Sequence, residues 1–255
     1  MPAPTGADRL FARYLDDPSR AWVAAVCAET ARAHAGLRAP VSLGYLAFRL
    51  AAGLGRPLAF ASRAGTVLDA LQPVIDLADN LADEELDRAR GLDLARRYPG
   101  VPRDALPSLA ALMTACAVSA LHDDFPAPAY RPREAAARVI AALARMTRGQ
   151  GMPPDAPTRV DDIAGRQAEL ICLPLWLDPA GPPDEAGRAA VERWAFRYGR
   201  LWQLRQDVLE AAPGDDLPRA RFDDAAREAA AAWPGFAPFL PGGALARGAL
   251  LGGGP

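Results

Sequence analysis

Apolar residues recur every three or four positions along most of the 255-residue chain, and the strict alternation typical of a half-buried strand is hard to find. This periodicity predicts an all-α protein. The expected helices, with ends accurate to about 2–4 residues, cover residues 7–14, 19–34, 40–53, 57–89, 91–97, 104–122, 132–148, 159–177, 183–211 and 222–232.

Short segments rich in proline and glycine separate the expected helices, and none of them is long enough to link two domains. We therefore expect residues 1–255 to form a single domain, with a frayed glycine-rich tail at about 241–255. The helix at 57–89 has an apolar stripe that gives way to acidic residues only near its C-terminal end. We expect this helix to be central and mostly buried.

Charge and composition narrow the range of partners. The net charge is -2, and charged residues of both signs alternate along most of the chain, so no basic stripe is present to neutralise a nucleic-acid backbone. The three cysteines, Cys27, Cys116 and Cys172, lie far apart in apolar runs without the spacing of a zinc site or a disulfide framework. We expect no nucleic-acid partner and three small buried thiols in a reducing compartment.

The N-terminal segment is charged and lacks the apolar stretch of a signal peptide. No uninterrupted run of about 20 apolar residues, the length that a membrane-spanning helix needs, is found either, because the run LAALMTACAVSAL stops at His122. These features predict a cytoplasmic protein that does not span a membrane.

The most unusual segment is LADNLADEELDR, residues 77–88, in which half of the side chains are acidic or amide. Asp76, Asp79 and Asp83 follow one another at helical spacing and project from one face. Such carboxylates repel one another unless a cation lies among them, and oxygen ligands without His or Cys suit Mg²⁺. The alternative is a solvated helix end with Arg88 and Arg90 as exposed charge partners, and the segment alone leaves both interpretations open.

Two further polar clusters interrupt helices that are otherwise apolar. Gln203, Asp207 and Glu210 share one face of the helix at 183–211. Arg166 and Gln167 lie in another apolar helix, where they could neutralise anionic oxygens. For Arg166 the alternative is a side chain that extends along the helix to reach solvent.

The order and spacing of these segments resemble the polyprenyl synthetase family, the trans-isoprenyl diphosphate synthases. The resemblance covers about residues 36–217. It implies a single-domain helical bundle of the class I isoprenoid synthase type with a central apolar cavity. The segments that correspond to the family motifs, beginning with the first aspartate motif and ending with the second, are DNLAD at 79–83, RARG at 88–91, GQ at 149–150, RQA at 166–168 and WQLRQDVLE at 202–210.

By this resemblance the chain binds an allylic prenyl diphosphate through Mg²⁺ and ionises it. The implied metal ligands are Asp79, Asp83 and Asp207. The implied catalytic residues are Asp79, Asp83, Arg166, Gln203 and Asp207. The implied substrate-binding residues are Arg38, Arg88, Arg90, Gln150, Gln167, Gln206 and Glu210.

The sequence also departs from the family pattern. Asn80 replaces the middle aspartate of the first motif, and Gln206 stands where the second motif has its leading metal-binding aspartate. A neutral amide is a poorer Mg²⁺ ligand than a carboxylate. The segment AGLRAP at 35–40, which corresponds to the isopentenyl diphosphate site of the family, keeps a single basic residue, Arg38. Ordinary chain elongation is therefore disfavoured.

We expect a prenyltransferase of isoprenoid metabolism, acting as a homodimer, that passes the prenyl group to an acceptor other than isopentenyl diphosphate. Two alternatives stay open. One is a terpene cyclase on the same fold, although only 7% of the residues are aromatic and could stabilise a carbocation. The other is a non-catalytic subunit of a prenyl synthase, which the neutral side chain of Gln206 favours.

Overall fold

The computed structural model describes residues 6–35, 42–82, 93–153, 156, 158–180, 185–210 and 217–236. Within these ranges the chain forms helices and turns and no strand, which confirms the predicted all-α class. The elements are α1 (Gly6–Phe11), α2 (Asp17–Ala35), α3 (Leu43–Gly53), α4 (Leu58–Ala82), α6 (Leu94–Arg97), the 3₁₀ turn η1 (Arg103–Ala105), α7 (Leu106–Asp124), α8 (Pro132–Gln150), α9 (Arg159–Ile171), α10 (Leu173–Leu177), α11 (Glu185–Glu210) and α12 (Leu217–Phe236).

Most helix boundaries agree with the sequence prediction, with two clear differences. The helix expected at 222–232 is longer in the structure, where α12 covers Leu217–Phe236. The other difference lies in the segment expected as one helix at 159–177. The structure divides it at Cys172 into α9 and α10. Pro174 explains the break, because it has no amide hydrogen to donate to the preceding turn and its ring crowds that turn. The expected tail at 241–255 and the end of the helix expected at 57–89 lie outside the described residues.

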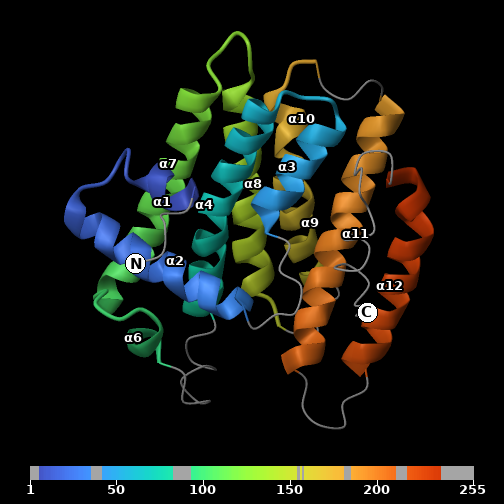
Figure 1. Cartoon of the computed structure of the whole chain (residues 1–255). Helices are drawn as coiled ribbons and strands as arrows, with labels where there is room; N and C mark the ends of the chain where they lie inside the picture. Colours follow the sequence, from blue (N-terminus) through green and yellow to red (C-terminus); the bar gives the residue numbers. More distant parts are fainter. Residues whose placement is uncertain are drawn as a thin grey trace.

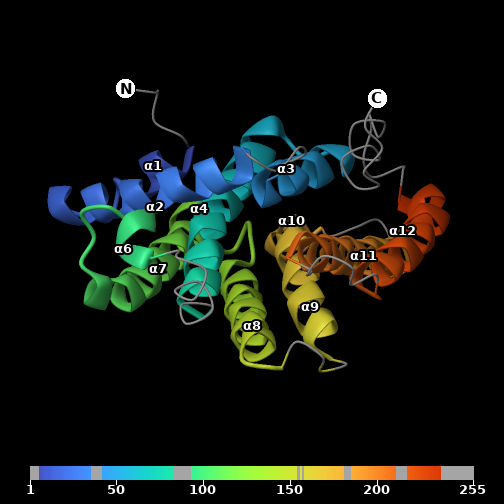
Figure 2. The same ribbon diagram turned by 90° about the horizontal axis from the view of Figure 1, so that it is seen from below.

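Helix α4 lies in the middle of the bundle, as the sequence predicted (Figures 1 and 2). It packs against α1, α3 and α7, and its apolar stripe is fully enclosed: Leu68 and Leu71 are 0% exposed and Ile75 is 1% exposed. Burial of such large apolar side chains contributes roughly 1.5–3 kcal/mol each to folding. The core built around α4 fixes the direction of the acidic end of this helix.

The helices beyond α4 form a second layer, in which α8 packs on α9, α9 on α11, and α11 on α12. Figure 1 shows the C-terminal ends of α4, α8 and α11 at the same end of the bundle as the N-terminal ends of α9 and α12. The C-terminal ends of α4 and α11 therefore lie at one end of the bundle. A smaller apolar cluster of Leu201, Leu204 and Ala225 joins α11 to α12.

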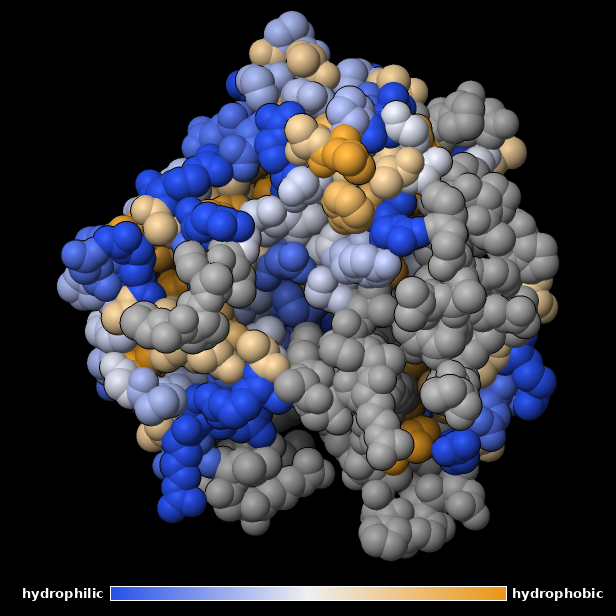
Figure 3. All heavy atoms as spheres, viewed as in Figure 1, coloured by the Kyte–Doolittle hydropathy of each residue, from blue (hydrophilic) through white to orange (hydrophobic). Residues whose placement is uncertain are grey.

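The three cysteines are free thiols: Cys116 and Cys172 are buried and Cys27 is half-buried. The predicted burial is confirmed for Cys116 and Cys172, whereas Cys27 is only partly enclosed. Hydrophilic residues cover much of the described surface on the face seen in Figure 1, with smaller hydrophobic areas between them (Figure 3).

One segment in the described part of the chain, Arg103–Asp124, is long and apolar enough to cross a membrane by length and composition. Its C-terminal portion is α7, which packs against α4 and thus contributes to the core. Core helices of soluble proteins have the same length and composition. The expectation that the chain does not span a membrane stays a prediction.

Glycines allow α3 and α4 to approach each other closely. A Cβ atom added to Gly65 would lie 2.8 Å from the carbonyl oxygen of Gly44, and one added to Gly44 would collide with the Gly65 carbonyl oxygen and the Asp69 carboxylate. Burial raises the pKa of Asp69, while hydrogen bonds from the Ser42 side chain and the Gly44 backbone act in the opposite direction. The close approach of Gly44 and Gly65 leaves no room for a larger residue at either position.

We predict that Gly44→Ala destabilises the protein by about 1–3 kcal/mol, because the added methyl group meets backbone as well as side-chain atoms. The free energy of unfolding in urea, followed by circular dichroism, measures the change. Gly151→Ala is the matched control, since its Cβ would make only an ordinary contact, 3.5 Å from the Thr147 carbonyl oxygen. Equal stability of the two variants would contradict the proposed close contact.

Candidate functional site

Three residues singled out from the sequence meet where the ends of α4, α8 and α9 come together. Gln150 Nε2 donates a hydrogen bond of 2.6 Å to Asp79 Oδ1. Arg166 Nη1 lies 3.8 Å from the same oxygen. We call Asp79, Gln150 and Arg166 the Asp79 cluster. The structure thus brings together parts of three motifs that lie far apart in the sequence.

The Arg166 side chain is almost completely enclosed, with 3% of its surface exposed. This corrects the alternative interpretation that Arg166 extends to solvent. Burial lowers the pKa of its guanidinium, and the negative charges of Asp79 and Asp76 act in the opposite direction. Its Nε and Nη1 atoms are buried and make no hydrogen bond within the part of the chain that the structure describes. Buried donors of this kind are suited to an anionic oxygen.

Close packing of α8 against α9 positions the cluster. A Cβ atom added to Gly149 would lie 2.8 Å from Ile163 Cγ1, and one added to Gly165 would lie 3.0 Å from Arg145 Nη1. Gly149 therefore lets α9 approach α8, and the next residue, Gln150, presents its amide to Asp79. This gives a local reason for the Gly-Gln pair noted in the sequence.

Asp76 supplies a second carboxylate one helical turn before Asp79, on the same face of α4. Gln72 Nε2 donates a hydrogen bond of 3.0 Å to Asp76 Oδ1. Both carboxylates act electrostatically on Arg166. They are oxygen donors of the type that Mg²⁺ uses, one or two at a time together with phosphate oxygens, so they fit one side of the expected metal site.

Asn80 takes part in a different network. Its amide donates a hydrogen bond of 2.5 Å to the Tyr98 hydroxyl, and its carbonyl oxygen accepts one from Arg97. Tyr98 is 1% exposed, and burial raises the pKa of its hydroxyl to about 12, although the hydrogen bond with Asn80 acts in the opposite direction. Asn80 thus ties α4 to α6. This role could not be predicted from the sequence, because nothing in the motif indicates partners 17 and 18 positions later.

The remaining predicted site residues are only partly placed. Gln203 is 9% exposed and lies in α11, as expected for a polar residue on a buried helix. The structure describes the backbone, but not the side chains, of Gln167, Gln206, Asp207 and Glu210. Four residues lie outside the described ranges altogether: Arg38, Asp83, Arg88 and Arg90.

The expected Mg²⁺ site therefore stays a prediction, since two of its three ligands are the Asp83 and Asp207 side chains. Among the residues that the structure describes, no group of three or more His, Cys, Asp or Glu side chains is placed to hold a metal ion.

Comparison with protein-family models, curated proteins and solved structures finds no match for this chain. The class of protein is thus defined by its own structure: an all-α bundle in which a buried arginine meets carboxylates at one end. The isoprenoid synthase type and the central apolar cavity stay predictions.

We predict that the free energy of unfolding falls between pH 10 and pH 12 and that Tyr98→Phe removes part of this fall. The folded-state pKa of Tyr98, about 12, lies above the ordinary value of 10.0. The stabilisation by the neutral phenol is thus fully present below pH 10 and lost as the pH rises toward 12. The shift corresponds to roughly 2–3 kcal/mol.

Urea unfolding at a series of alkaline pH values measures the effect, and the chain contains no lysine that would titrate in the same range. Tyr45→Phe provides the matched control, because it removes a hydroxyl from a tyrosine that is 40% exposed. Parallel curves for wild type and Tyr98→Phe would contradict the prediction.

Proposed function

We propose that the chain binds the diphosphate group of an allylic prenyl diphosphate at the Asp79 cluster and transfers the prenyl group to an acceptor other than isopentenyl diphosphate. The observation that carries this proposal is the enclosed Arg166, whose buried Nε and Nη1 atoms make no hydrogen bond within the described residues. Its position beside Asp79 supports the correspondence with two motifs of the polyprenyl synthetase family.

In the proposed reaction Arg166 donates hydrogen bonds to oxygens of the departing diphosphate. Such donors contribute most where negative charge grows in a water-excluded site. Gln150 holds the Asp79 carboxylate through its 2.6 Å hydrogen bond. When bound, Mg²⁺ supplies further positive charge to the leaving group. Asp79 would hold the ion, together with Asp83 and Asp207 if the family pattern applies.

A second candidate is the non-catalytic subunit, and one observation favours it. Asp79 is already hydrogen-bonded to Gln150 and paired with Arg166. A carboxylate engaged in this way can serve as an internal link between helices without binding a metal ion. The terpene cyclase is a third candidate, and the proposed prenyltransferase is a cytoplasmic homodimer.

We predict that purified protein with Mg²⁺ releases diphosphate from geranyl, farnesyl or geranylgeranyl diphosphate, and that Arg166→Gln lowers the rate about 100-fold or more. Loss of one donor to a developing oxyanion has an effect of this size. The matched control is Arg148→Gln, which removes an exposed arginine that pairs with Asp162 and also joins α8 to α9. The control should keep the wild-type rate within about twofold.

The products and a binding measurement separate the candidates. Transfer gives a prenylated acceptor, and hydrocarbons from a single substrate indicate cyclisation. Prenyl diphosphate binding that depends on Arg166, without diphosphate release, indicates a non-catalytic subunit. Wild type that neither binds nor cleaves any of the three substrates would overturn the proposal. Circular dichroism of Arg166→Gln and Arg166→Lys shows whether either variant loses activity through unfolding.

A further inference from the structure

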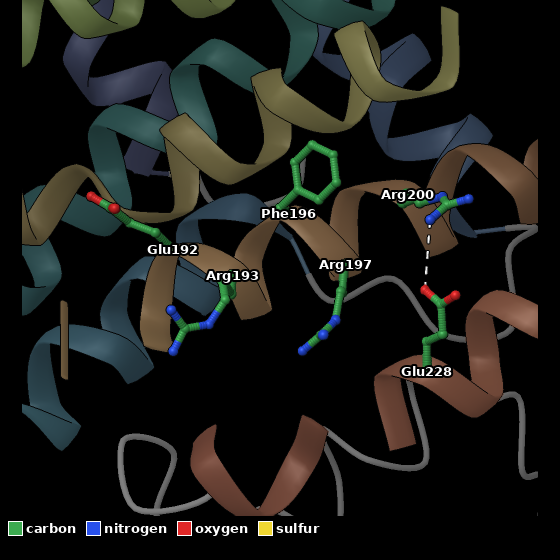
Figure 4. Close-up of a pocket in the computed structure, with 6 residues that line it drawn as sticks. All are labelled: Glu192, Arg193, Phe196, Arg197, Arg200 and Glu228. Atoms are coloured by element: carbon green, nitrogen blue, oxygen red, sulfur yellow. Dashed lines mark ion pairs between the residues drawn. The ribbon is translucent and has the colours of Figure 1, made fainter. Parts of the chain in front are cut away.

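A hollow of about 430 Å³ lies beside α11 and α12 (Figure 4). Its lining consists of Glu192, Arg193, Phe196, Arg197, Arg200 and Glu228. We call it the α11–α12 groove. The Asp79 cluster is built by α4, α8 and α9, so the two sites are lined by different helices.

The two carboxylates of the groove already have cationic partners. Glu192 Oε1 lies 3.4 Å from Arg188 Nε on the same helix. Glu228 Oε2 lies 3.6 Å from Arg200 Nη1 across the groove, the ion pair drawn in Figure 4. Neither acidic residue is therefore available to neutralise the remaining arginines.

Arg193 and Arg197 are those remaining arginines, and they lie one turn apart on α11. Figure 4 shows both side chains leaving the helix on the same side, toward the space between α11 and α12. Within the described part of the chain neither makes an ion pair or a hydrogen bond. Two like charges at this spacing repel each other. The charged side chains that line the groove sum to +1, and Arg193 and Arg197 are the two cations on which a bound dianion could be held.

We propose that the α11–α12 groove binds a small phosphorylated molecule, with the phosphate group shared by Arg193 and Arg197. A phosphate ester carries nearly two negative charges at neutral pH. Guanidinium groups match its geometry by donating pairs of hydrogen bonds. The volume of the groove lies in the range of small-molecule sites. This proposal is independent of the prenyl transfer proposed above.

Isothermal titration calorimetry with phenyl phosphate as the probe tests the proposal. We expect saturable binding by wild type and at least about tenfold weaker binding by the double variant Arg193→Gln, Arg197→Gln. The matched control is Arg96→Gln, Arg133→Gln, which changes the net charge equally at two exposed arginines on other helices. The control should bind as wild type does. Arg166→Gln should also retain binding, which separates the groove from the Asp79 cluster.

Several results would overturn the proposal. These are absence of saturable binding by wild type, equal weakening in the control, or loss of binding in Arg166→Gln alone. Phosphatidylserine vesicles form a further arm of the experiment. Vesicle binding that depends on Arg193 and Arg197, without phenyl phosphate binding, would mean that the groove faces a membrane surface rather than a small molecule.

Discussion

Arg166 carries a positive charge into the interior of the bundle, and the arrangement of the surrounding helices depends on that charge. A guanidinium with 3% exposure has lost nearly all contact with water, so the protein must supply negative charge close by. Asp76 and Asp79 do so from one face of α4. Rotating α4 by half a turn would remove both carboxylates and leave the buried charge alone, so Arg166 constrains the orientation of the central helix.

That electrostatic constraint agrees with the packing of the helices. Gly44 and Gly65 bring α3 against α4, and Gly149 brings α8 against α9. Each contact excludes a side chain as small as alanine unless neighbouring atoms move. The glycines thus hold α4 and α8 at short range from their neighbours, and the polar ends of these helices meet as a consequence.

The sequence predicted most of the helices because apolar residues recur at helical spacing and proline or glycine lies near most of the helix ends. It also predicted that Asp79, Gln150 and Arg166 belong to one site, and the structure confirms their proximity. It did not predict the break at Cys172, since the periodicity continues across it. Nor did it predict the Arg193 and Arg197 pair, because a surface arginine becomes notable only when its neighbours are known to be paired elsewhere.

Asn80 departs from the aspartate motif of the family, and it has a structural role of its own. Its side-chain oxygen accepts a hydrogen bond from Arg97, and its side-chain nitrogen donates one to the Tyr98 hydroxyl. An ionised aspartate accepts hydrogen bonds but donates none. It could pair with Arg97, yet it would meet the buried Tyr98 hydroxyl only if that hydroxyl turned to donate. Asn80 therefore suits the contact with α6, while Asp79, the preceding residue, faces α8 and α9. Two successive residues thus belong to separate networks. Of the two, only the network of Asp79 includes a buried cation, Arg166, whose Nε and Nη1 atoms make no hydrogen bond within the described residues.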